Sequence, residues 1–86
     1  MQHIQIDTSR VVRLLYHLLG QVQPRLAEYI GLSDHFANDW GIAPEDHQAY
    51  LHLLEQHFQI ILQESDRQSL NSIQHTLDFL TRQTQN

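Results

Sequence analysis

The chain has 86 residues, a net charge of −5 at pH 7, no cysteine and no lysine, so its five basic residues are all arginines. A chain this short folds as one domain and buries only about 60% of the surface that it exposes when unfolded, which leaves little room for a deep active site. We therefore expect a single domain over residues 1–86 that is not an enzyme. The absence of cysteine excludes a disulfide framework and a thiolate zinc site.

Charge and hydropathy narrow the choice of partners. Nucleic-acid binding needs clustered lysine and arginine, whereas the arginines here are scattered along an acidic chain. No window approaches the roughly 18–20 apolar residues of a membrane span, and residues 1–7 lack the basic start and the apolar run of a signal peptide. We expect a cytoplasmic protein that binds neither nucleic acid nor membrane and that meets a protein partner with a basic surface.

The first predicted helix follows a clear apolar period. Its start is predicted at Asp7, Thr8 or Ser9, whose side chains accept hydrogen bonds from the first free backbone N–H groups. Gly20 is predicted to end the helix, since glycine adopts the left-handed conformation without a Cβ penalty. The apolar face repeats at i, i+3, i+4, i+7 and i+8 and consists of Val11, Leu14, Leu15, Leu18 and Leu19.

A long connection follows, from residue 21 to residue 43. We predict one or two helical turns over Pro24–Ile30, with proline at an early position and glycine just beyond the end. Further on, Phe36 and Trp40 are expected to pack under the helices, and Trp40 is interpreted as an anchor of the core. Connections longer than about 12–15 residues are uncommon in compact domains and are often functional.

A second main helix is predicted to begin at Pro44. Glu45 and Asp46 fall in its first turn, where carboxylates interact favourably with the helix dipole. The helix is predicted to run to about Phe58. The residues expected to face inward are Tyr50, Leu51, Leu54 and Phe58.

The remaining elements are a short helical turn and a last main helix. The turn is predicted over Ser65–Ser69, after the apolar residues 60–62. The last helix is predicted to open at Asn71 or Ser72. No segment shows the alternation of a strand, so the predicted fold class is all-α, with three main helices and one or two minor ones. The apolar seam of the last helix consists of Leu70, Ile73, Leu77 and Leu80.

The spacing of these pieces resembles the acyl carrier protein family. Members of that family read roughly F-x-x-D-L-G-x-D-S-L-D, then a helix ending in E-x-x-F, then a last helix with I-x-T-V-x-D-A-I-x-Y-I. Residues 36–41 read FANDWG, residues 54–58 read LEQHF and residues 70–80 read LNSIQHTLDFL, and they align without a gap over about half of the chain. The resemblance implies an acyl-carrier-protein-like four-helix bundle with a long first loop. It also implies phosphopantetheine on a serine at the start of the second helix.

The attachment motif is where this chain departs from the family. In place of D-S-L it reads Ala43-Pro44-Glu45, and proline has neither a hydroxyl group nor a backbone N–H. We therefore expect no prosthetic group at Pro44 and no acyl-carrying chemistry there. The alternative is a genuine carrier in which phosphopantetheine is attached at a non-standard hydroxyl, with Ser33 as the candidate.

The resemblance also implies a docking role for the second predicted helix, with which family members meet basic patches on their enzymes. On this helix we expect partner contacts at Glu45, Asp46, His47 and Glu55. The function indicated is a non-catalytic protein-interaction module whose partner is an acyl-transfer or synthase enzyme of fatty acid or polyketide biosynthesis. A further alternative is non-covalent binding of a fatty ligand beside Leu54 and the apolar residues 60–62.

Histidines are frequent, with seven in the chain. His47, His52 and His57 recur every five residues, about 140° apart around a helix. Ligand pairs on one helix are instead spaced at i, i+4. We therefore expect no metal site on this helix, and no serine–histidine–aspartate order or glycine-rich phosphate loop indicates catalysis.

Overall fold

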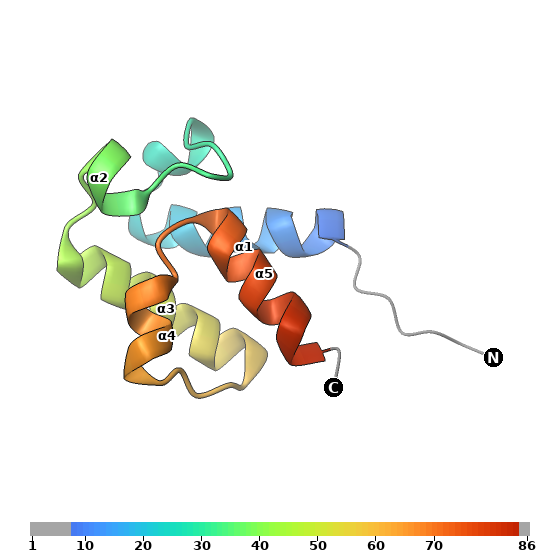
Figure 1. The fold of residues 1–86 in the computed structure, drawn as a ribbon. Coiled ribbons are helices and arrows are strands. Elements are labelled where there is room, and N and C mark those ends of the chain that lie inside the picture. Colours follow the sequence, from blue (N-terminus) through green and yellow to red (C-terminus); the bar gives the residue numbers. More distant parts are fainter. Residues whose placement is uncertain (1–7, 85–86) are drawn as a thin grey trace.

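The computed structural model describes residues 8–84, and the regular structure in this range is entirely helical. No strand occurs among these residues, so the predicted all-α class is confirmed. Asp7 and the rest of residues 1–7, for which a cap and the lack of a signal peptide were predicted, lie outside the described range. The elements in chain order are α1 (Thr8–Val22), the 3₁₀ turn η1 (Leu26–Glu28), α2 (Phe36–Trp40), α3 (Pro44–Phe58), α4 (Glu64–Ser69) and α5 (Ile73–Thr84) (Figure 1).

Helix α1 is longer than predicted. The prediction that Gly20 ends the helix is wrong, because the helix continues through Val22. The N–H of Gln23 still donates to the carbonyl of Leu19 at 2.7 Å, whereas Pro24 has no N–H with which to extend the pattern. The buried residues of α1 all come from the predicted apolar face and are Leu15, Leu18 and Leu19.

The connection between α1 and α3 contains η1, which confirms a helical turn within Pro24–Ile30, and the short helix α2. The side chain of His35 caps the start of α2, because its Nδ1 accepts hydrogen bonds from the N–H groups of Ala37 and Asn38 at 3.2 and 3.0 Å. Gly41 ends α2 with a φ of 67°, a left-handed conformation that favours glycine.

The two aromatic residues of α2 have different surroundings. Phe36 is buried, as predicted, but Trp40 is 39% exposed, so the interpretation of Trp40 as a core anchor is wrong. The indole N–H of Trp40 donates to Oδ2 of Asp34 at 2.8 Å. This bond satisfies the polar atom of the ring at the surface, and the end of α2 at Gly41 leaves the ring outside the core.

Helix α3 begins at Pro44 and ends at Phe58, as predicted. Phe58 is half-buried and packs against the core. Gln59 follows with a φ of 56°, a left-handed backbone conformation that residues other than glycine seldom adopt. The buried residues of α3 are Tyr50, Leu51 and Leu54.

Helices α4 and α5 both begin at side-chain caps. Gln63 and Asp66 form a reciprocal capping box at the start of α4. Before α5, the hydroxyl oxygen of Ser72 accepts a hydrogen bond from the N–H of His75 at 3.0 Å. Ser72 was one of the two predicted starts of this helix, so the structure confirms it.

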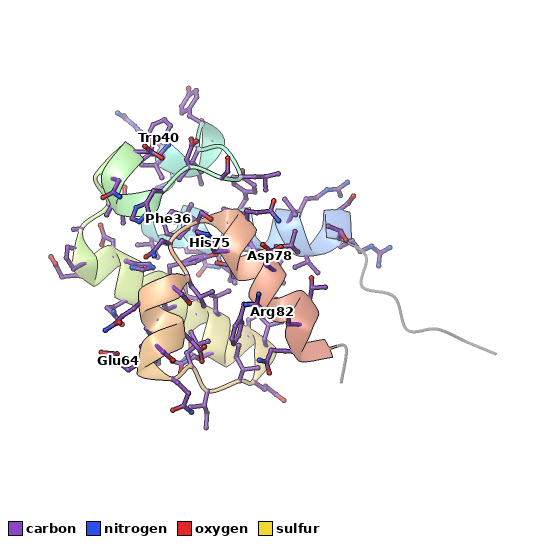
Figure 2. All side chains as sticks on the ribbon, in the orientation of Figure 1. Phe36, Trp40, Glu64, His75, Asp78 and Arg82 are labelled. Atoms are coloured by element: carbon purple, nitrogen blue, oxygen red, sulfur yellow. The ribbon has the colours of Figure 1, made fainter. Side chains whose placement is uncertain are left out.

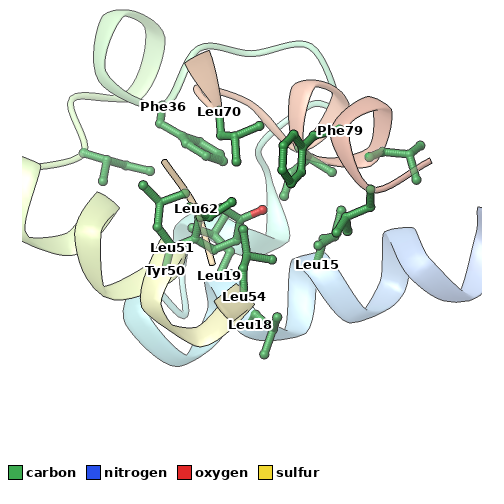
Figure 3. Packing of buried hydrophobic residues seen from close by; sticks show 14 of the residues in the cluster. Leu15, Leu18, Leu19, Phe36, Tyr50, Leu51, Leu54, Leu62, Leu70 and Phe79 are labelled. Atoms are coloured by element: carbon green, nitrogen blue, oxygen red, sulfur yellow. The ribbon is translucent and has the colours of Figure 1, made fainter. Parts of the chain in front are cut away.

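The buried side chains of these helices form one cluster (Figure 3). Helix α1 contacts α3, α5 and η1. The rings of Phe36 and Tyr50 meet edge to face, with centroids 5.3 Å apart. The phenol of Tyr50 donates to Oγ1 of Thr76 at 3.1 Å, and this buried pair joins α3 to α5.

Two backbone hydrogen bonds hold the long connection against the start of α5. The N–H of Gln74 donates to the carbonyl of Leu32 at 2.9 Å, and the N–H of Phe36 donates to the carbonyl of Asn71 at 2.8 Å. Gln74 lies in the first turn of α5, where N–H groups have no acceptor within the helix. The connection is therefore part of the packed structure. None of the helices in the described range is both long and apolar enough to cross a membrane.

Candidate functional site

The start of α3 is the candidate site, because the sequence places Pro44 there in place of the family's serine. Ala43 precedes the helix in an extended conformation, with φ −64° and ψ 149°, and Pro44 is the exposed first helical residue. The first backbone bond of the helix runs from the N–H of His47 to the carbonyl of Ala43 at 3.0 Å. Neither Ala43 nor Pro44 presents a hydroxyl, an amine or a carboxylate, so neither of these two residues offers a nucleophile.

The two carboxylates of the first turn differ in their surroundings. Glu45 is exposed, whereas Asp46 is half-buried. The amide Nε2 of Gln23, just beyond α1, donates to Oδ2 of Asp46. Asp46 therefore helps to hold the end of α1 against the start of α3, and Glu45 is the carboxylate that faces solvent at this end of the helix.

His47 is a half-buried structural residue in this arrangement. Its Nε2 lies 2.8 Å from the carbonyl oxygen of Leu70, which only accepts, so this nitrogen carries the proton and donates. The imidazole also meets the ring of Phe36 edge to face, with centroids 5.6 Å apart. His47 thereby links α3 to α2 and to the residue between α4 and α5.

Glu55 takes part in an ion pair inside the molecule. Its Oε2 accepts from the N–H of Leu62 at 2.9 Å, and its Oε1 accepts from Nη2 of Arg67 at 2.7 Å. These two donors, the Leu62 N–H first and the Arg67 guanidinium second, hold the pKa of Glu55 below its ordinary value. Arg67 also donates from Nη1 to Oε1 of Gln48 at 3.0 Å, so it connects α4 to α3 at two points.

The four predicted partner-binding residues therefore do not form one surface. Glu45 and Asp46 lie together at the start of α3, and His47 turns toward Leu70. Glu55 lies ten residues further along the helix, about 15 Å from Glu45 along the axis. Among the exposed residues of α3, Glu45 is the one carboxylate; the others are Pro44, Gln48, Ala49, His52, Gln56 and His57.

Sequence reasoning missed the partners of these side chains. Gln23 lies 23 residues from Asp46, and Arg67 lies 12 residues from Glu55. Neither pair has the i, i+3 or i, i+4 spacing that identifies contacts within a helix. Only the packing of α1 and α4 against α3 brings them together, so no local signal could have identified them.

The residues of the two alternative hypotheses lie elsewhere. Ser33 is exposed in the turn before α2, closed by the N–H of Asp34 bonding to the carbonyl of Gly31 at 3.2 Å. The helix that follows has only five residues, so Ser33 does not stand at the start of a main helix. Of the apolar residues proposed to line a fatty-ligand site, Leu62 is buried and Ile61 is 83% exposed.

Within residues 8–84, no three histidine or acidic side chains come together in a way that could hold a metal ion. No model of a known protein family matches the sequence, and no curated protein matches it either. The functional proposal consequently depends on the geometry of α3 and on the residues at its start.

Proposed function

We propose that this protein is an acyl-carrier-like domain that acts as a non-catalytic protein-interaction module and carries no phosphopantetheine. The observation on which the proposal depends is Pro44, exposed at the first position of α3. In the acyl carrier resemblance this position belongs to the serine whose hydroxyl oxygen attacks a phosphoryl centre. Proline is well suited to the first turn of a helix, so the substitution removes the nucleophile while the helix is retained.

The order and size of the helices support the carrier-like architecture. A long first helix, α1, is followed by a long connection, a second long helix α3, a short helix α4 and a last long helix α5. The resemblance implies the same order, with the long first loop in the same place. In this proposal α1, α3, α4 and α5 are the four helices of the bundle, and α2 is an addition within the loop.

The proposed partner is an enzyme with a basic patch that normally receives a carrier protein. Glu45 is the solvent-facing carboxylate beside Pro44, and Asp46 adds a second negative charge at the same end of α3. Charge complementarity of this kind raises association rates and selects partners. Because Pro44 has no hydroxyl, the protein would occupy such an enzyme without being modified by it.

A competition assay tests this docking role. A phosphopantetheinyl transferase modifies a genuine acyl carrier protein while the concentration of this protein is raised. We expect inhibition that a higher carrier concentration relieves, and we expect Glu45→Lys to weaken it.

The matched control for this assay is Asp78→Lys, which makes the same charge change at an exposed position of α5. The control variant should inhibit as the native protein does. The docking role is contradicted if the native protein does not inhibit, or if both variants lose inhibition equally.

A further inference from the structure

A second exposed surface lies on the long connection between α1 and α3. Among the described residues, four large apolar side chains are exposed, and three of them belong to this connection. Tyr29 is 72% exposed, Leu32 41% and Trp40 39%, and we call these three residues the Trp40 surface. In Figure 2, Trp40 lies at the outer edge of α2, at the opposite end of the molecule from Glu64 of α4.

Hydrogen bonds hold two residues of the Trp40 surface, Trp40 and Leu32, in place. Oδ2 of Asp34 accepts from the indole N–H of Trp40 and from the N–H of Gly31, each at 2.8 Å, so the indole lies beside the turn that contains Leu32. The carbonyl of Leu32 is in turn bonded to the N–H of Gln74. An apolar surface that is already ordered loses little conformational entropy when a partner binds.

The segment that carries this surface contains more negative than positive side chains. Residues 25–41 contain three carboxylates, those of Glu28, Asp34 and Asp39, and one guanidinium, that of Arg25. His35 caps the start of α2, where its Nδ1 accepts hydrogen bonds from two backbone N–H groups. The segment thus has a net charge of −2, three negative against one positive.

We propose that the Trp40 surface binds a protein partner through a basic amphipathic segment. Apolar side chains of that segment would pack against Tyr29 and Leu32, and an arginine or lysine would lie over the indole of Trp40, because aromatic faces attract cations. A second copy of the chain fits less well, since a symmetric contact would bring the negative charges of this surface together. The surface lies on other elements than the start of α3, so this proposal does not depend on the proposed function.

Trp40 is the only tryptophan of the chain, and its fluorescence therefore reports on this surface directly. The probe is a synthetic helical peptide of arginine and leucine that contains no aromatic residue. Titrated into the full-length protein, it should shift the emission of Trp40 saturably. Truncating an aromatic or apolar anchor typically weakens binding about tenfold or more, so Tyr29→Ser and Leu32→Ser should each raise the Kd by about that factor.

The control variant is Ile61→Ser, which removes the fourth exposed apolar side chain, between α3 and α4. This variant should bind the peptide as the native protein does. All three substituted residues are exposed, so their thermal melting by circular dichroism should match the native curve and exclude unfolding as the cause.

Four results would overturn the proposal. The first is no saturable change with the arginine–leucine peptide, and the second is equal affinity for a glutamate–leucine peptide of the same pattern. The third is a loss of affinity in Ile61→Ser as large as that in Tyr29→Ser. The fourth is an emission shift that follows protein concentration without peptide, which would identify a second copy as the occupant.

Discussion

The hydrogen-bonded chain from Tyr50 through Thr76 to Ser72 gives the most detailed prediction about stability. The side chains of all three residues are buried. The phenol of Tyr50 donates to Oγ1 of Thr76 at 3.1 Å, and the hydroxyl of Thr76 donates to the carbonyl of Ser72 at 2.9 Å. The two substitutions Tyr50→Phe and Thr76→Val remove different hydrogen bonds of this series. They should therefore lower the free energy of unfolding by unequal amounts.

Tyr50→Phe removes a donor but leaves no polar atom without a partner. Oγ1 of Thr76 still donates to the carbonyl of Ser72, so the expected loss is that of one ordinary hydrogen bond, about 1 kcal/mol. For a domain of this size such a loss lowers Tm by about 4–8 °C. The high pKa of Tyr50, raised by burial, means that the phenol is neutral at all ordinary pH values.

Thr76→Val should cost more than Tyr50→Phe. The phenol of Tyr50 would stay buried without an acceptor, which costs about 2 kcal/mol, whereas the carbonyl of Ser72 keeps the N–H of residue 76 as a donor at 3.1 Å. The double variant removes both polar side-chain groups and should be more stable than Thr76→Val alone. Its total cost should be about 1 kcal/mol rather than the sum of the single costs.

Urea unfolding followed by far-UV circular dichroism measures all four proteins of this cycle. The free energy of unfolding of each is compared with that of the native chain. Two results would contradict this reasoning about the buried hydrogen bonds. One is an equal loss of unfolding free energy in the two single variants, and the other is a loss in the double variant equal to the sum of the single losses.

Two further predictions concern α3. Gln59→Gly should raise the free energy of unfolding by about 1 kcal/mol, since glycine adopts the left-handed conformation of this position without strain. Gln56→Gly, within the helix, should lower the free energy of unfolding by about 1 kcal/mol. Urea unfolding of both variants shows whether the two changes have opposite signs. The Leu62 N–H and Arg67 lower the pKa of Glu55 in the folded protein. The Glu55 carboxylate therefore stabilises the fold at pH values above its unfolded pKa, and this stabilisation is lost as the pH falls through its folded pKa. Glu55→Gln should therefore reduce the decline of the urea midpoint below about pH 4.3, and a decline identical to that of the native protein would contradict this role.

Much of the helical framework could be predicted because its signals are local. The apolar period of α1, the proline at the start of α3 and the serine before α5 each act within one or two turns of helix. Gly20 misled the prediction because a glycine is compatible with a helix interior as well as with its end. Pro24 was the stronger signal for the end of α1, since proline has no backbone N–H with which to continue the hydrogen bonds of a helix.

The surroundings of the site could not be predicted because they depend on contacts between distant elements. Trp40 has the spacing from Phe36 that predicts a shared buried face, but Asp34 bonds its indole at the surface. Glu55 has the spacing of a solvent-facing carboxylate on α3, but α4 brings Arg67 against it. In both cases hydrogen bonds from outside the helix decide the position of the side chain.

These contacts also change the expected docking surface. Because Asp46, His47 and Glu55 each hold another element of the fold, a partner that meets the start of α3 finds Glu45 as its main anionic contact. Substitutions at the other three residues would change the packing as well as the charge. Glu45 is therefore the position at which docking and folding can be separated experimentally.

We propose that the chain has the carrier-like arrangement of helices and that Pro44 stands where the family has the serine that carries phosphopantetheine. The most direct test of this proposal is the intact mass of two proteins after incubation with coenzyme A and a broad-specificity phosphopantetheinyl transferase. One is the native chain, and the other is the variant Ala43→Asp, Pro44→Ser, Glu45→Leu, which restores the family's attachment motif. We predict an unchanged mass for the native chain and a gain of one phosphopantetheine arm for the variant. A gain by the native chain would contradict the inference from Pro44, and an unchanged mass in a folded variant would contradict the carrier-like arrangement.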